Sequence, residues 1–161
     1  MKFRKASEKD KDSINALYLD GSKSLERLGV NQWQNDELPK VEDISKIYLI
    51  EDNKEVVATA LLIDYDKDYD KIYEGSWISS GKYFAVHRFV TSSLHRQKGL
   101  ASYLLEEIEK IALKDSVKSI RIDTHEDNIP MQKFLLKSGF IKCGIVYLRK
   151  SGKRIAFEKE L

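Results

Sequence analysis

The spacing of apolar and polar residues changes several times along this 161-residue chain, and each spacing predicts a type of secondary structure. Short runs rich in β-branched and aromatic residues predict strands, whereas apolar residues that recur every three or four positions predict helices. Strands are expected at 2–6, 47–50, 56–63, 83–90, 120–123, 140–148 and 154–158. Helices are expected after a cap at 7–10, over 22–28, at 39–46, from 97 and from 130. This order favours a mixed α/β sheet with helices on its faces.

The clearest change of pattern lies in the middle of the chain. Within Tyr83–Val90 only His87 and Arg88 are polar, which is typical of a central strand buried on both faces. From Gln97 onward the apolar residues share one side of a helix, at Leu100, Leu104, Ile108 and Ile111. The sequence therefore predicts a buried strand that leads through a short turn into an amphipathic helix.

Composition narrows the classes of protein to consider. The 28 basic and 26 acidic residues leave a net charge of +2, which is too balanced to indicate a nucleic-acid-binding protein. Cys143 is the single cysteine, and we expect it to be a small buried residue rather than a nucleophile. The apolar run Val56–Ile63 is far shorter than the ~20 residues that span a bilayer, and the first residues lack the apolar core of a signal peptide. We expect one cytoplasmic domain, residues 1–161, that binds neither membranes nor nucleic acid.

The turn His95–Ser102 has the features of an anion site. It joins the buried strand to the amphipathic helix, where free backbone amides and the positive helix end favour an anion. Gly99 allows a phosphate to approach closely. Arg96 and Lys98 add donors but oppose the helix dipole, which costs stability unless an anion lies between them. This cost favours an anion site over the alternative, a turn with a solvated basic rim.

The same segment resembles a known family. Arg96–Ala101 is similar to the R/Q-x-x-G-x-G/A loop with which the GNAT superfamily of N-acetyltransferases binds the pyrophosphate of acetyl-CoA. The likeness continues through the helix, the strand at 120–123, Asn128 and Lys137–Phe140. The resemblance implies a GNAT-like single domain. Its twisted, mostly antiparallel sheet would have about six to seven strands, helices on both faces and a splayed central strand pair.

The resemblance also implies acetyl-CoA as co-substrate and a set of residues that bind it. The backbone of one strand would pair with the pantetheine arm, at Phe89, Val90 and Thr91. The turn would hold the pyrophosphate through Arg96, Gln97, Lys98, Gly99, Leu100, Ala101 and Ser102. Asn128 would hydrogen-bond the pantetheine, and Met131 and Phe134 would pack near its far end.

The sequence departs from the family pattern at one position. Many members carry a tyrosine seven residues after the asparagine, where it protonates the departing thiolate, and here that position is Leu135. Either another group protonates the sulfur or the thiolate leaves unaided, which a thiol pKa of ~8.5 tolerates.

Three residues are candidates for catalysis. His87 is the first candidate for the base because its ordinary pKa suits proton transfer; the alternative is a core histidine bonded to a carbonyl. Glu74 is a second candidate, acting through water. Tyr147 is a candidate for the missing acid, against the alternative of a core aromatic residue. A main-chain amide within Phe89–Thr91 would stabilise the oxyanion.

Two tryptophans and an acidic segment complete the candidates. Trp33 and Trp77 would line the substrate pocket, unless they serve only in packing. Residues 64–71 repeat the pattern Asp-Tyr-Asp-Lys twice, but they lack the glycine and glutamate of a calcium loop, so we expect a solvated charged loop and no metal.

The sequence therefore predicts an enzyme that transfers the acetyl group of acetyl-CoA to a primary amine by direct attack. The amine would be a small molecule or belong to a peptide, and the enzyme would be a monomer or homodimer. A non-catalytic CoA-binding or regulatory module with the same fold is the alternative, motivated by Leu135. A nucleic-acid binder that uses the basic turn is disfavoured by the balanced charge.

Overall fold

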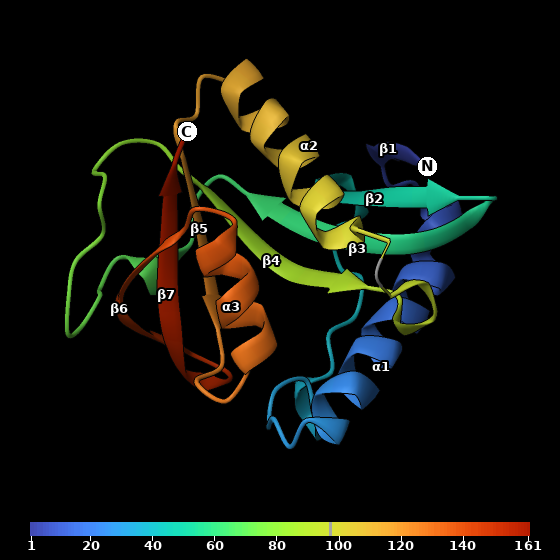
Figure 1. Cartoon of the computed structure of the whole chain (residues 1–161), viewed down its shortest axis with the longest axis horizontal. Coiled ribbons are helices and arrows are strands. Elements are labelled where there is room, and N and C mark those ends of the chain that lie inside the picture. The colour runs from blue at the N-terminus through green and yellow to red at the C-terminus, as the bar shows by residue number, and fades with distance from the viewer. Residues whose placement is uncertain (97) are drawn as a thin grey trace.

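The computed structural model describes residues 1–96 and 98–161, and those residues form one sheet with helices on both faces (Figure 1). The strands are β1 (Lys2–Lys5), β2 (Ile47–Asp52), β3 (Glu55–Ile63), β4 (Phe84–Thr91), β5 (Ser119–Thr124), β6 (Ile141–Leu148) and β7 (Gly152–Glu160). The α-helices are α1 (Lys11–Arg27), α2 (Leu100–Lys114) and α3 (Ile129–Lys137). In the described residues, no helix is both long and apolar enough to cross a membrane.

The seven strands are arranged in the order β1-β2-β3-β4-β5-β7-β6. Every pair of neighbours is antiparallel except β4 and β5, which are parallel. This arrangement confirms the predicted mixed, mostly antiparallel sheet.

The two faces of the sheet bury different helices. On one face, Ile47 and Leu49 of β2 pack with Ile14 and Tyr18 of α1. On the other face, Ile50 belongs to a larger core that includes the apolar sides of α2 and α3. Because side chains alternate along a strand, neighbouring residues of β2 serve opposite faces.

The structure corrects two predicted helices near the start of the chain. Residues 22–28 are not a separate helix, because α1 runs without interruption through Gly21. A Cβ at Gly21 would lie 2.8 Å from Val90 and 2.9 Å from the Trp33 ring, so glycine allows α1 to approach β4 closely. The expected helix at 39–46 is only a 3₁₀ turn, η3 (Ile44–Lys46).

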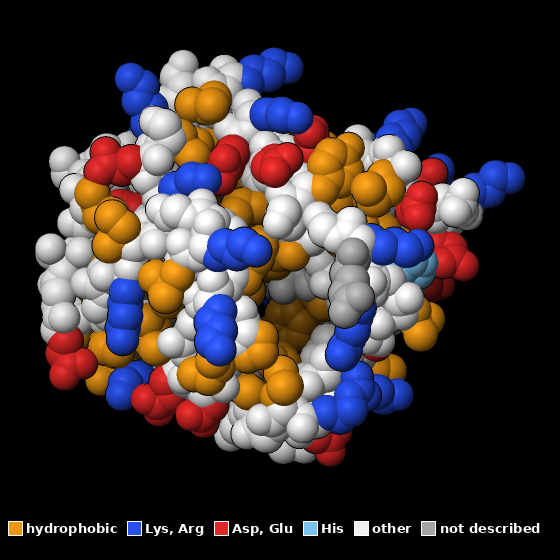
Figure 2. All heavy atoms as spheres, viewed as in Figure 1, with side chains coloured by type: hydrophobic (Ala, Val, Ile, Leu, Met, Phe, Trp, Pro, Cys, Tyr) orange, Lys and Arg blue, Asp and Glu red, His pale blue; other side chains and the backbone are white. Residues whose placement is uncertain are grey.

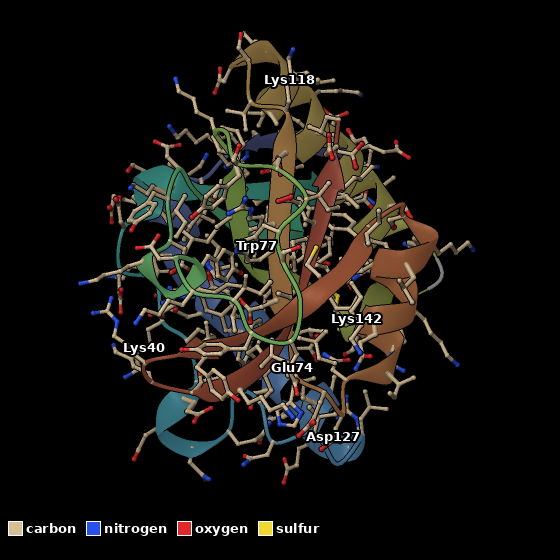
Figure 3. The ribbon with its side chains drawn as sticks, turned by 90° about the vertical axis from the view of Figure 1, so that its left-hand side faces the viewer. Lys40, Glu74, Trp77, Lys118, Asp127 and Lys142 are labelled. Carbon is tan, nitrogen blue, oxygen red and sulfur yellow. The ribbon has the colours of Figure 1, made fainter. Side chains whose placement is uncertain are left out.

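The segment between β3 and β4, which we call the strap (residues 64–83), lies on the same face of the sheet as α1. On that side of β3, Leu61 packs with α1 and Ile63 packs with the strap. The strap corrects the expectation of a solvated loop, because Tyr69 in η4 (Lys67–Tyr69) is buried among Tyr83, Val146 and Ala156. Figure 3 shows the strap crossing the strands, with Trp77 near the centre of the view and Glu74 below it.

A buried ion pair fastens the strap to the sheet. Arg121 Nε donates to Glu158 Oε1 at 2.7 Å, and both side chains are almost fully buried. The guanidinium also donates to the Ser79 carbonyl and lies between the rings of Trp77 and Tyr83, 4.3 and 4.1 Å from their centroids. The strap therefore covers polar side chains of β5 that the alternating pattern assigns to a solvated face.

The bonds of Arg121 to Glu158 and to the Ser79 carbonyl, which we call the clasp, should contribute strongly to stability. Glu158→Gln removes the charge that compensates buried Arg121, and we expect the free energy of unfolding to fall by about 3–5 kcal/mol. Glu126→Gln is the control, because its partner Lys153 is exposed and such pairs contribute about 0–1 kcal/mol. Urea unfolding measures both variants, and equal losses would contradict the assignment.

Candidate functional site

A cavity of about 1050 Å³ opens where β4 and β5 separate. The two strands pair only at Phe84 with Ile120 and at Ala85 with Arg121, after which they diverge. This finding confirms the predicted splayed central pair. Figure 2 shows the hollow, with hydrophobic side chains toward its floor and lysine and arginine side chains on parts of its rim.

A β-bulge helps to direct β4 away from β5. The register of β4 with β3 passes from Leu61 opposite His87 to Thr59 opposite Val90, so β4 contains one extra residue. Arg88, within this bulge, has a φ of +51°. Bulges bend and twist the strand that carries them, which agrees with the divergence seen here.

Five of the predicted cofactor residues line the cavity. Three of them come from the end of β4 and two from the start of α3: Phe89, Val90, Thr91, Asn128 and Met131. Asn128 caps α3 through its Oδ1, which accepts from the Met131 amide at 3.3 Å and leaves Nδ2 available as a donor. Phe134 does not line the cavity itself, but its ring packs against Phe89, with the two ring centroids 5.8 Å apart.

The beginning of α2 has free donors next to the end of β4. Gly99 is the N-cap and has a φ of +67°, in the left-handed region that glycine adopts without strain. No side chain of the described residues caps this end, and the first helical amides bound within the helix start at Tyr103. The amides of Leu100, Ala101 and Ser102 are therefore available, with Arg96, Lys98 and Gly99 exposed beside them. Gln97 lies outside the described residues.

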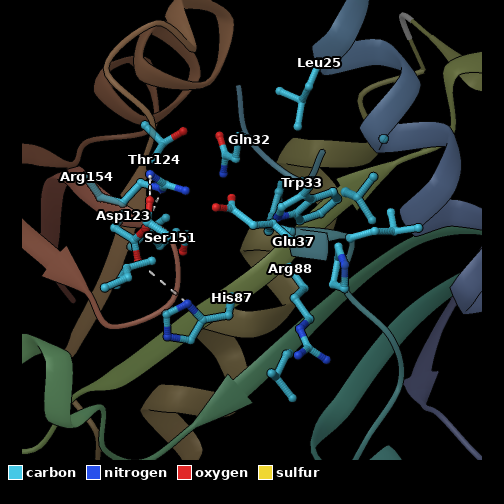
Figure 4. Close-up of a pocket in the computed structure, with 18 of the residues that line it drawn as sticks. Leu25, Gln32, Trp33, Glu37, His87, Arg88, Asp123, Thr124, Ser151 and Arg154 are labelled. Atoms are coloured by element: carbon cyan, nitrogen blue, oxygen red, sulfur yellow. Dashed lines mark hydrogen bonds and ion pairs between the residues drawn. The ribbon is translucent and has the colours of Figure 1, made fainter. Parts of the chain in front are cut away.

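Two residues before Phe89 on β4, His87 stands between two carboxylates. Its Nε2 lies 2.6 Å from Asp66 Oδ2, and its Nδ1 lies 3.7 Å from Asp123 Oδ2. Asp123 also accepts from the Tyr69 hydroxyl at 2.6 Å and lies 4.0 Å from Arg154 Nε. His87 is therefore bonded to a carboxylate rather than to a carbonyl, and its ring faces the cavity (Figure 4).

These contacts shift the ionisation of the cluster. Burial lowers the pKa of His87, but the hydrogen bond to Asp66 and the charge of Asp123 outweigh this effect and raise it above the ordinary value. Burial raises the pKa of Asp123, although His87 partly offsets the effect. Burial also favours protonated Asp66, yet its bond to His87 leaves the pKa of Asp66 lowered. The site thus favours a charged imidazole paired with ionised Asp66, while burial favours the protonated form of Asp123.

The other predicted site residues have different surroundings. Trp33 lines the cavity, where its ring meets Tyr18 edge-on. Glu74 and Tyr147 are exposed and do not line the cavity; Tyr147 packs against Tyr73 on the outer side of β6. Trp77 packs on Arg121 in the clasp instead of lining the cavity. Only His87 among the three catalytic candidates is thus brought to the cavity.

Leu135, at the departure from the family pattern, is fully buried in the core beneath α3. Cys143 is buried, as expected, and burial raises the pKa of its thiol. Among the described residues, no group of three or more His, Cys, Asp or Glu side chains is placed to hold a metal ion.

Several cavity residues escaped the sequence analysis. Asp66 was assigned to a solvated loop, and Asp123 and Arg154 to ordinary strand positions, yet all three line the cavity. Asp66 is 21 residues from His87, so no local pattern brings the two together. The sequence held one indication of this cluster: Asp123 is an acidic residue at the end of the strand expected at 120–123.

The ionisation of His87 can be measured by NMR titration of its imidazole. We expect a midpoint above 6.5 that falls in Asp66→Asn, whereas Asp68→Asn, whose carboxylate contacts Arg149, should leave it unchanged. Because folding raises this pKa, protonated His87 stabilises the fold fully below pH ~6.5, and the effect is lost as the pH rises through the raised pKa. A midpoint below 6.5 in the unsubstituted protein would contradict this geometry.

Comparison with known proteins connects this geometry to a family. Residues 14–140 match the acetyltransferase (GNAT) family. A crystal structure of a GNAT-family acetyltransferase from Streptococcus agalactiae is 27% identical, with a TM-score of 0.85 over 99% of this chain and 95% of that one. The PaiA N-acetyltransferase of Thermoplasma acidophilum, solved in complex with coenzyme A, shares the fold at 15% identity, with a TM-score of 0.73 over 99% and 98% of the two chains.

The similarity to a curated protein is more local. Over 61 residues, the chain is 36% identical to the streptothricin acetyltransferase of Escherichia coli. The match covers 38% of this chain and about a third of that protein's length (35%).

Proposed function

Since this chain belongs to the acetyltransferase (GNAT) family, we propose that it transfers an acetyl group from acetyl-CoA to a primary amine. One observation carries this proposal: the unpaired edge of β4 borders a cavity and leads to the amides at the start of α2 that the helix leaves without partners. A strand edge suits an extended amide-containing chain, and a helix start suits a phosphate group. Acetyl-CoA contains an extended amide-containing pantetheine arm and a pyrophosphate group.

The donor substrate would be held along this path. The amides of Leu100, Ala101 and Ser102 would bind its pyrophosphate, with Arg96 and Lys98 supplying charge. The backbone of Phe89–Thr91 and the Nδ2 of Asn128 would bind the pantetheine arm. The thioester would then lie within the cavity, close to His87.

The reaction needs a neutral amine, because only its lone pair attacks the thioester carbonyl. The C–N bond forms, the C–S bond breaks and the thiolate leaves, while a main-chain amide of β4 stabilises the oxyanion. His87 would accept the proton that the amine loses when its imidazole is neutral, and because its pKa is raised the neutral form increases as the pH rises. Since buried Leu135 offers no proton, the thiolate would leave unaided or take one from solvent.

A matched pair of variants tests the proposed donor site. Nothing lies within 4 Å of a Cβ placed on Gly99, so Gly99→Glu adds a carboxylate in open space where the pyrophosphate would bind. Acetyl-CoA at ~100 times its Kd should raise the Tm of the unsubstituted protein by roughly 5–10 °C. We expect Gly99→Glu to lose this shift.

Gly99→Gln is the control for this test. It has the same left-handed backbone strain and a side chain of similar size, but it does not repel a phosphate. We expect it to keep most of the shift in Tm. A shift of equal size in Gly99→Glu and Gly99→Gln would show that the pyrophosphate binds elsewhere.

The activity itself is tested by acetyl transfer to a panel of primary amines, with free thiol and acetylated product measured together. Turnover of any amine with equal amounts of both products supports the proposal. A non-catalytic CoA-binding module instead predicts binding of acetyl-CoA without turnover across the panel.

A further inference from the structure

Two buried hydrogen-bond acceptors in the cavity have no partner among the described residues, and carboxylates of η2 (Asn35–Glu37) lie in the same lining. Thr124 Oγ1 and Gln32 Oε1 are buried without a hydrogen bond, and Thr124 is only 1% exposed. Glu37, at the end of η2, is exposed at the cavity lining and makes no side-chain hydrogen bond or ion pair in the part of the chain that the structure describes. Figure 4 shows all three side chains pointing into the same part of the cavity.

Thr124 Oγ1 and Gln32 Oε1 carry an energetic penalty, because buried acceptors without a partner have given up their hydrogen bonds to water. Thr124 ends β5, whereas Gln32 and Glu37 belong to the connection after α1, so the three groups come from opposite walls. Their convergence on one cavity indicates a ligand that brings hydrogen-bond donors.

The cations around the cavity do not fill this role. Arg154 donates to the carbonyls of Ser151 and Lys153 and lies near Asp123. Arg88 donates to the Lys40 carbonyl and lies 3.9 Å from Glu42. Lys40 and Lys150 are exposed at the cavity lining. The arginines are thus committed to other partners.

We propose that Glu37, Gln32 and Thr124 bind a primary ammonium group of the amine substrate. An ammonium offers three donors and no acceptor, which matches one carboxylate, one amide oxygen and one hydroxyl. The carboxylate also compensates its charge.

This ammonium is not the group that reacts. A neighbouring carboxylate favours the charged form of an amine, and a charged amine has no lone pair for attack. The substrate must therefore carry a second amino group, which reaches the thioester beside β4. This inference rests on the proposed acetyl transfer and narrows the substrate class to diamines and polyamines.

Probes of equal chain length separate the contribution of the second ammonium. We would measure kcat/KM for 1,4-diaminobutane, butylamine and 4-aminobutanoate, and for longer diamines against their monoamines. Diamines should exceed monoamines of the same length by about tenfold, and 4-aminobutanoate should react more slowly than butylamine.

Variants identify the residues responsible. Glu37→Gln should lower kcat/KM for diamines about tenfold, mainly through KM, and leave monoamines unchanged. Thr124→Val should weaken diamine binding in the same direction. Glu26→Gln removes an exposed carboxylate of α1 that does not line the cavity and controls for a general loss of negative charge, with a change below about twofold expected.

The outcomes distinguish this inference from the proposed function. Equal kcat/KM for diamines and monoamines, or an equal loss of both in Glu37→Gln, would overturn the ammonium site while acetyl transfer stands. If no amine is acetylated, calorimetry of 1,4-diaminobutane in the presence of coenzyme A still tests the site. Binding that Glu37→Gln weakens supports it, and no binding to the unsubstituted protein overturns it.

Discussion

The separation of β4 from β5 is the constraint on which the rest of the structure depends. Backbone N–H and C=O groups inside a protein need partners, and a central strand normally finds them on both sides. Here β5 supplies partners only at Phe84 and Ala85, so the remainder of that β4 edge faces a cavity. A ligand that pairs with this edge would supply the backbone hydrogen bonds that a neighbouring strand normally provides. Such a ligand would offset the energetic cost of the gap at the centre of the sheet.

Elements on both sides keep the gap open. On one side, α1 packs closely on β4 because Gly21 leaves room for Val90 and the Trp33 ring. On the other side, the clasp of Arg121 and Glu158 holds the strap against β5 and β7. The strap in turn brings Asp66 to His87, so the same packing that supports the cavity also sets its charge.

Features that depend on local sequence were predictable, and features that depend on distant contacts were not. The two later helices follow from neighbouring residues: they were predicted from 97 and from 130, and α2 and α3 begin at Leu100 and Ile129. The strap was misassigned because its acidic composition resembles a solvated loop, whereas Tyr69 and Asp66 find partners far along the chain. Arg121 and Glu158, 37 residues apart, are buried against each other in the same way.

The unpaired edge of β4 is tested most directly by amide hydrogen exchange, resolved by residue, with and without acetyl-CoA. Binding along this edge predicts slower exchange for the amides of β4 that face β5 and for those of Leu100–Ser102, with little change in β1 and β2. Unchanged exchange in β4 at saturating acetyl-CoA would contradict the claim that the substrate takes the place of the missing strand.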